Sequence, residues 1–86
     1  MHKIPIVNGR ELKKGDRIEY QITRLAGVDY NPPIIHRGTV VNPDAKTMKD
    51  TWVVQIKAER FNPALPDHDF STDIRAIYGD DIINII

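Results

Sequence analysis

The segment Thr51-Trp52-Val53-Val54-Gln55-Ile56-Lys57 decides the fold, and its expected partner is Gly38-Thr39-Val40-Val41 just upstream. Every second residue from Trp52 to Ala58 falls on one side, which is the period of a β-strand with one buried face. The polar stretch between the two segments favours a hairpin. We therefore predict that they form two adjacent central strands of a very small β-barrel.

The remaining strands are predicted from the same alternation and from the turn residues that separate them. In Arg17–Thr23, isoleucine or tyrosine alternates with charged and polar residues. The apolar run Ile4–Val7 ends at the turn dipeptide Asn8-Gly9, and Gly15-Asp16 belongs to a second turn. The predicted strands are 17–23, 34–41, 51–58, 72–78 and 82–86.

Two proline-bearing stretches predict long loops, at 25–33 and 61–70, because proline cannot donate to a β-ladder. The polar stretch 42–50 is expected to be a hairpin connection. Gly38 inside its strand is typical of a bulge or tight bend. No stretch has the apolar period of a substantial helix, but a single 3₁₀ turn is expected at 79–82.

Length and composition indicate one domain over residues 1–86, near the lower size limit of a freestanding core. The chain has no cysteine, which excludes disulfides and thiolate metal sites. No apolar run reaches membrane-spanning length, and the start of the chain lacks the apolar region of a secretory signal. We expect a cytoplasmic protein with no membrane association.

The order of strands and turns resembles the SH3-like barrel, in particular its KOW and Tudor variants. The resemblance covers most of the chain from Lys13 onward. It rests on the segments 15–20, 37–41 and 52–56, which read GDRIEY, RGTVV and WVVQI. It implies an all-β, small SH3-like barrel of five or six strands with two long loops. The family also includes nucleic-acid-associated modules.

Candidates for catalysis or metal binding are few. Asp67-His68-Asp69 has metal-binding residue types, but neighbours in an extended chain point in opposite directions. Ser71 with His68 and Asp67 would need a rigid support that one loop does not provide. Asp80 and Asp81 are a carboxylate pair, yet Gly-Asp-Asp between strands is more typical of a turn. We predict no enzyme, no cofactor and no metal site.

Basic residues suggest one binding surface, although the net charge is zero. Residues 1–24 contain six basic and three acidic side chains, whereas residues 59–86 contain two basic and six acidic ones. If the first turn and the first long loop meet at one end of the barrel, they form a cationic patch with His36 and an aromatic ring for base stacking. The predicted nucleic-acid-binding residues are Lys13, Lys14, Arg17, Arg24, Tyr30 and Arg37. The alternative is that these charges only solvate exposed loops.

Apolar residues suggest a second binding surface. Trp52 is expected in the core or as a plug at the barrel end, with a protein-contact role as the alternative. Adjacent isoleucines in 82–86 cannot all face one core, so some are expected at an exposed edge that pairs with a second copy or a partner. The predicted protein-binding residues are Trp52, Tyr78, Ile83 and Ile85.

Two functions remain open. The first is a non-enzymatic protein-interaction module, an accessory or inhibitory protein of the phage or mobile-element type, with a host or cognate protein as partner and a homodimer through the C-terminal strand as an alternative. The second is a nucleic-acid-associated module that binds RNA or DNA through the basic residues. Neutral charge favours the first, and the fold resemblance favours the second. An oligomeric enzyme has no residue-level support.

Overall fold

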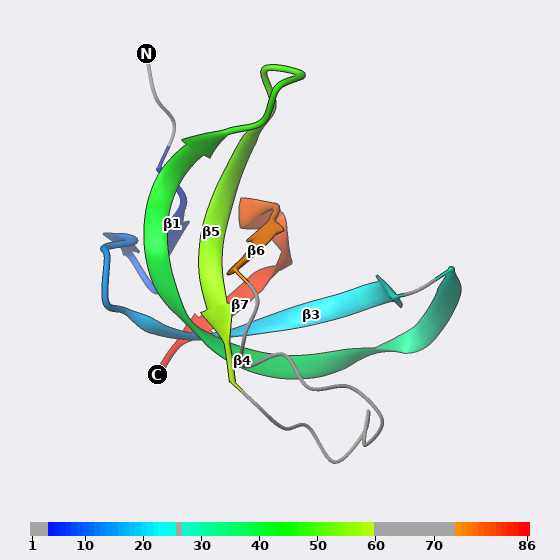
Figure 1. The fold of residues 1–86 in the computed structure, drawn as a ribbon. Coiled ribbons are helices and arrows are strands. Elements are labelled where there is room, and N and C mark those ends of the chain that lie inside the picture. The colour runs from blue at the N-terminus through cyan, green and yellow to red at the C-terminus, as the bar shows by residue number, and fades with distance from the viewer. Residues whose placement is uncertain (1–3, 26, 60–73) are drawn as a thin grey trace.

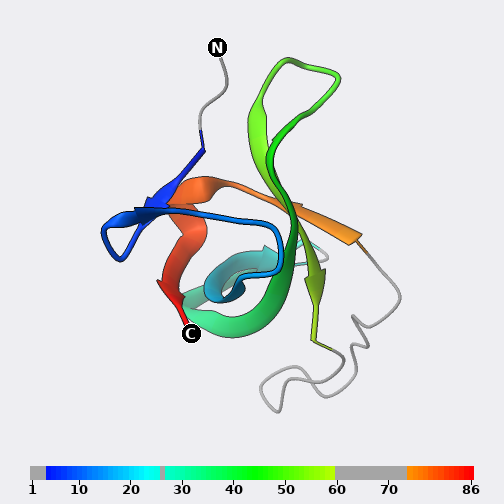
Figure 2. The ribbon, with the colours of Figure 1, turned by 90° about the vertical axis from the view of Figure 1, so that its left-hand side faces the viewer.

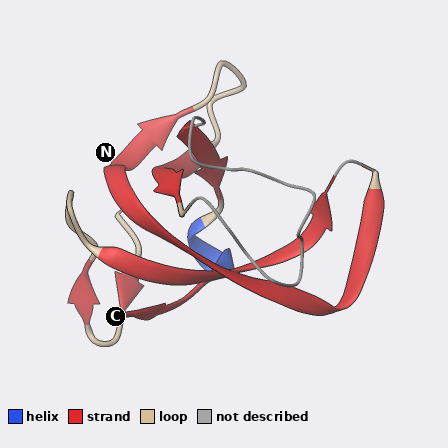
Figure 3. Cartoon of the chain, turned by 60° about the horizontal axis from the view of Figure 1, so that its bottom comes forward, coloured by secondary structure: helices blue, strands red, loops and turns tan. Residues whose placement is uncertain are grey.

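The described residues fold mainly into antiparallel strands, as Figures 1 and 3 show. The computed structural model describes residues 4–25, 27–59 and 74–86. Five strands form one sheet in the order β6-β5-β4-β3-β7, and β1 pairs with β2 in a separate sheet. The elements are β1 Ile6–Val7, β2 Arg10–Glu11, β3 Arg17–Leu25, β4 Val28–Lys46, β5 Trp52–Ala58, β6 Ile74–Ile77, the 3₁₀ turn η1 Gly79–Asp81 and β7 Ile82–Ile85. The all-β prediction is confirmed, and the 3₁₀ turn begins where it was expected.

The alternating positions of the sequence build the core. Ile18, Tyr20 and Ile22 of β3 are buried on one face. Val54 and Ile56 of β5 are buried as well. The predicted pairing of the two central segments is confirmed, because residues 38, 39 and 40 stand opposite 58, 57 and 56. The buried apolar residues are Val7, Leu12, Ile18, Tyr20, Ile22, Val40, Ala45, Val53, Val54, Ile56, Ala58, Ile77 and Ile82.

Strand β4 passes through the whole fold and pairs with β3 at one end and β5 at the other. Its 19 residues would span roughly 60 Å if straight, at about 3.3 Å per residue. The longest dimension of the molecule is 38 Å, so β4 must curve. Figure 1 shows this curve joining two hairpins that point in different directions. Figure 2 shows the β1–β2 hairpin beside β7.

The predicted loop 25–33 is wrong. Strands β3 and β4 continue into it as a hairpin arm, in which Arg24 pairs with Asp29 across the ladder. The prolines fit because they lie in a bulge: four residues, 30–33, stand opposite the single residue 23. A bulged residue donates no ladder hydrogen bond, so the missing N–H of proline costs nothing there.

The connection 42–50 is shorter than predicted, again because a proline lies in a bulge and does not end the strand. β4 continues to Lys46, and Pro43 lies in a second bulge where residues 43 and 44 stand opposite residue 54. The hairpin turn itself is closed by Thr47, whose N–H donates to the carbonyl of Thr51 at 2.9 Å.

Of the two features expected at Gly38, a bulge or a tight bend, the bulge is wrong: the ladder is regular there, with Ile18 on one side and Ala58 on the other. It instead permits a close approach of β5, because an added Cβ would lie 3.0 Å from the carbonyl oxygen of Lys57.

The C-terminal part follows its prediction where it is described. β6 covers part of the predicted strand 72–78, and β7 covers most of 82–86. The predicted loop 61–70 lies outside the described residues, as do the candidate residues Asp67, His68, Asp69 and Ser71.

Candidate functional site

Trp52 and Tyr78, both predicted protein-binding residues, line the same hollow. Trp52 begins β5, and Tyr78 connects β6 to η1. The hollow has a volume of about 590 Å³. Its lining is mostly apolar and consists of Ile4, Pro5, Ile6, Trp52, Tyr78, Gly79 and Asp80. We call it the Trp52–Tyr78 groove.

Large apolar side chains that line the groove are exposed to solvent. Ile6 is 70% exposed and Tyr78 is 60% exposed. Trp52 is half-buried and is absent from the buried core, so the expectation of a core position holds only in part. An amphipathic ring at the edge of an apolar hollow is a common feature of protein-contact sites.

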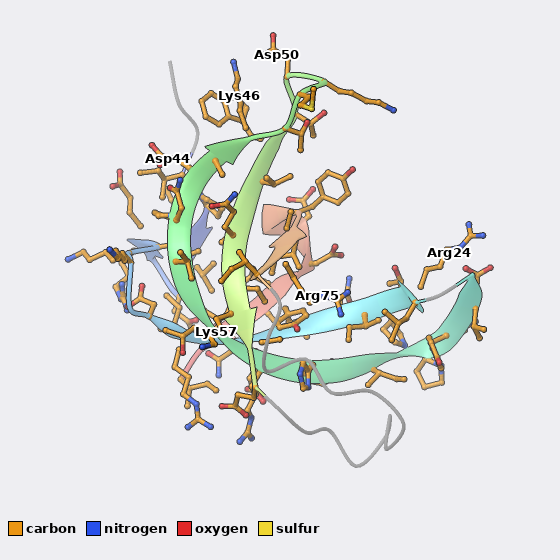
Figure 4. All side chains as sticks on the ribbon, viewed as in Figure 1. Arg24, Asp44, Lys46, Asp50, Lys57 and Arg75 are labelled. Carbon is orange, nitrogen blue, oxygen red and sulfur yellow. The ribbon has the colours of Figure 1, made fainter. Side chains whose placement is uncertain are left out.

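The β4–β5 hairpin holds the tryptophan ring in place. Lys46 is the ladder partner of Trp52, and its Nζ lies 4.6 Å from the centre of the indole ring. The same Nζ lies 3.2 Å from a carboxylate oxygen of Asp50. Figure 4 shows Lys46 and Asp50 together at the end of this hairpin. The cation lies within the range of a cation–π interaction and adds a weak attraction to the ring.

The opposite wall comes from the start of the chain, packed on η1. A Cβ added to Gly79 would lie 2.7 Å from Cγ of Pro5, so only glycine leaves room for this proline. The carbonyl of Pro5 also accepts the N–H of Leu12 at 3.0 Å, and Leu12 is buried in the core. Pro5 is therefore held by two contacts, its packing on Gly79 and its hydrogen bond with Leu12.

Two polar contacts fasten the β1–β2 hairpin, one to the turn before β3 and one to β7. Arg10 donates from both terminal nitrogens to the two carboxylate oxygens of Asp16, each at 2.9 Å. This hydrogen bond holds the pKa of Asp16 below its usual value, helped by the backbone N–H of Lys13. At the other end, Oδ1 of Asn8 accepts the N–H of Ile85 at 2.9 Å.

The other two predicted protein-binding residues lie on β7, at the edge of the five-stranded sheet. Ile83 is 50% exposed, whereas Ile85 is half-buried and packs against the core. Neither lines the Trp52–Tyr78 groove.

The structure does not gather the predicted nucleic-acid-binding residues into one patch. Lys13 and Lys14 lie in the turn before β3, next to Arg17 at the start of that strand. Arg24 lies near the other end of β3, seven residues away, or roughly 23 Å along a strand. Figure 4 shows Arg24 at the tip of the β3–β4 arm.

Each arginine of this predicted set faces a carboxylate, which reduces its positive field. Nε of Arg17 donates to Glu59 at 2.8 Å. The other pairs are Arg24 with Asp29, at 3.6 Å, and Arg37 with Glu19, at 3.5 Å.

The ring groups near the arginines are half-buried or buried. Tyr30 is half-buried and packs against the core. His36, which was expected to flank the basic patch, is only 3% exposed. Burial lowers the pKa of His36 below its usual value, so it carries no charge near neutral pH. The backbone carbonyl of Glu59 lies 3.0 Å from its Nε2, which therefore carries the proton.

The two adjacent carboxylates predicted as a pair, Asp80 and Asp81, lie in different surroundings. Asp80 lines the Trp52–Tyr78 groove, while Asp81 accepts a hydrogen bond from Gln21 at 3.3 Å. Among the described residues, no three His, Cys, Asp or Glu side chains form a group that could hold a metal ion. None of the helical structure within the described ranges has the length and apolar character needed to cross a membrane.

Sequence reasoning missed the wall formed by Ile4, Pro5 and Ile6. The only signal was a short apolar run before a turn, and a strand as short as β1 shows no measurable alternation. The hollow exists because this run folds back onto η1, a contact between the two ends of the chain.

Comparison of the chain with known proteins identifies no relative. No protein-family model, no curated protein and no solved structure matches the chain.

Proposed function

We propose that this chain is a non-enzymatic protein-interaction module that binds its partner through the Trp52–Tyr78 groove. The observation that carries the proposal is the convergence of Trp52, from β5, and Tyr78, from the connection between β6 and η1, on one open apolar hollow of about 590 Å³. Binding energy at protein interfaces concentrates in a few residues of this type, seated in hollows of this kind.

The expected partner is a host or cognate protein that inserts one or two apolar side chains beside Trp52. Lys46 over the indole and Asp80 in the lining supply charges of both signs around an apolar centre. A polar rim around an apolar centre is the usual arrangement of a protein interface. The accessory or inhibitory role in a phage or mobile element stays a prediction.

We also propose that the fold is an SH3-like barrel. The strand order β6-β5-β4-β3-β7 and the 3₁₀ turn between β6 and β7 support this assignment. The assignment does not by itself choose a ligand, because one fold carries many functions.

The experiment is capture of the partner from native cell extract with the tagged chain, before and after nuclease treatment and with washes at low and high salt. Tyr78→Ala and Trp52→Ala should each lose the partner, since hot-spot truncations commonly weaken binding about tenfold or more. Ile35→Ala is the matched control, because Ile35 is also exposed but lies outside the groove. Thermal unfolding of each variant confirms that it is folded.

Retention of a protein that survives nuclease and high salt, and that depends on Tyr78, supports the proposal. Equal capture by Tyr78→Ala, Trp52→Ala and the wild type would overturn it. Nucleic-acid binding stays the alternative prediction. It would appear as nucleic acid that is lost at high salt and on substitution of Lys13 and Lys14.

A further inference from the structure

A second hollow lies between β3 and β6, separate from the groove except for Tyr78, which lines both. It has a volume of about 240 Å³, smaller than a site for a drug-sized molecule. We call it the β3–β6 cleft. It is lined by residues 20–24 of β3 and by residues 75–78 and Asp81.

Tyr20 forms the floor of this cleft and is fully buried. Its hydroxyl has no hydrogen-bond partner among the residues that the structure describes. A buried polar atom without a partner is costly and rare in folded proteins, so it needs an explanation. Burial raises the pKa of Tyr20 to about 12, so the group is a neutral O–H donor at physiological pH.

Arg75 brings a positive charge to the same cleft. Figure 4 shows its side chain reaching from β6 toward β3. Arg75 and Tyr20 both line this cleft. A guanidinium has five N–H donors in a planar fork, so it can hold a carboxylate together with another acceptor.

The other groups around the cleft restrict the charge of its ligand. Arg24 also lines the cleft, but it faces Asp29. Asp81 adds one negative charge, and its Oδ1 accepts the side-chain amide of Gln21. A second negative charge on a ligand would be repelled by Asp81, so a monoanion fits better than a dianion.

We propose that the β3–β6 cleft binds a small organic monocarboxylate, whose carboxylate accepts hydrogen bonds from Arg75 and from the Tyr20 hydroxyl. The carboxylate satisfies the unpartnered phenol, and the burial of Tyr20 strengthens its hydrogen bond to a charged acceptor. The apolar part of the ligand contacts Ile22 and Ile77. This site does not depend on the proposed function of the Trp52–Tyr78 groove.

The test is an NMR titration of the full chain with acetate and lactate as probes, beside chloride and inorganic phosphate. We expect saturable shifts at the amides of residues 20–24 and 75–77 with millimolar Kd for the monocarboxylates only. Tyr20→Phe should weaken binding about tenfold, since it removes one charge-assisted hydrogen bond. It should fold normally, because the hydroxyl that it deletes has no partner in the described structure.

Arg75→Gln should abolish the shifts, while Arg37→Gln, on β4 and outside the cleft, should leave the Kd unchanged. Absence of saturable shifts would overturn the proposal. So would equal shifts with chloride and phosphate, which would indicate general ion effects. Wild-type affinity in both Tyr20→Phe and Arg75→Gln would overturn it as well.

Discussion

Tyr20 of β3 and His36 of β4 are direct ladder partners, and their rings meet edge to face with centroids 5.7 Å apart and an angle of 80° between the planes. Both side chains are almost completely buried. Edge-to-face pairs of this kind add about 0.5–1.5 kcal/mol to the gain from burial. The pair places an ionisable imidazole inside the core of a very small domain.

His36 should make the stability of the protein depend on pH. Its pKa in the folded state lies below the ordinary value of 6.5, because burial disfavours the charged ring. The unfolded chain therefore takes up a proton at a higher pH than the folded chain. The stability that this adds is fully present above pH 6.5 and is lost as the pH falls from there through the folded pKa.

Urea unfolding between neutral and mildly acidic pH measures this effect. The unfolding free energy of the wild type should fall across that interval, and the slope should be smaller in His36→Gln. His2→Gln and His68→Gln serve as controls for the other two histidines. An unchanged slope in His36→Gln would contradict the prediction.

Gly38→Ala should destabilise the fold by crowding. The added Cβ would lie 3.0 Å from the carbonyl oxygen of Lys57 and 3.1 Å from Cδ1 of Ile56. Overpacking of this type costs about 1–3 kcal/mol, and chemical denaturation measures it.

A double-mutant cycle identifies the cause. Ile56→Val removes Cδ1, so Gly38→Ala should cost less in that background than in the wild type. Some cost should remain, because the contact with the backbone of Lys57 is unchanged. If Gly38→Ala is as stable as the wild type, β4 and β5 have room that the structure does not show.

Asn8→Gly should favour self-association through β7. Oδ1 of Asn8 accepts the N–H of Ile85 on the outer edge of this strand, so the side chain blocks part of an edge that could pair with another copy. Glycine tolerates the positive φ of 55° at this position, so the substitution removes the acceptor without backbone strain.

Sedimentation velocity over a range of concentrations measures the result. Asn8→Gly should dimerise more tightly than the wild type, while Asn8→Asp keeps an acceptor and should behave as the wild type does. Identical distributions for all three proteins would show that this edge does not drive association. The homodimer of the natural sequence stays a prediction until then.

Local physics explains which parts of the fold could be predicted from the sequence. Alternation placed Ile18, Tyr20 and Ile56 in the core, because a strand turns every second side chain to the same face. The turn at Asn8-Gly9 also follows from composition, since both residues have positive φ there. These features depend on neighbours along the chain.

The prolines led to a wrong prediction of loops, because the effect of a proline on a strand depends on the strand that pairs with it. Pro32, Pro33 and Pro43 indicated loops, yet they lie inside β4, in bulges where no ladder N–H is required. Whether a strand can bulge is decided by the register of the opposite strand. The residues next to the prolines do not show that register, because it involves residues on β3 and β5.

The sequence by itself determined that this is a small all-β chain, and it named Trp52 and Tyr78 as contact residues. Only the tertiary structure decided that the two line one groove with Pro5 and Ile6, and that each arginine of the predicted basic patch faces a carboxylate. The physical reason is that alternation and turns specify the conformation of each strand, whereas a site depends on how the curved sheet brings distant strands together. In this chain the long curved β4 and the packing of Pro5 on Gly79 bring the residues of the groove together.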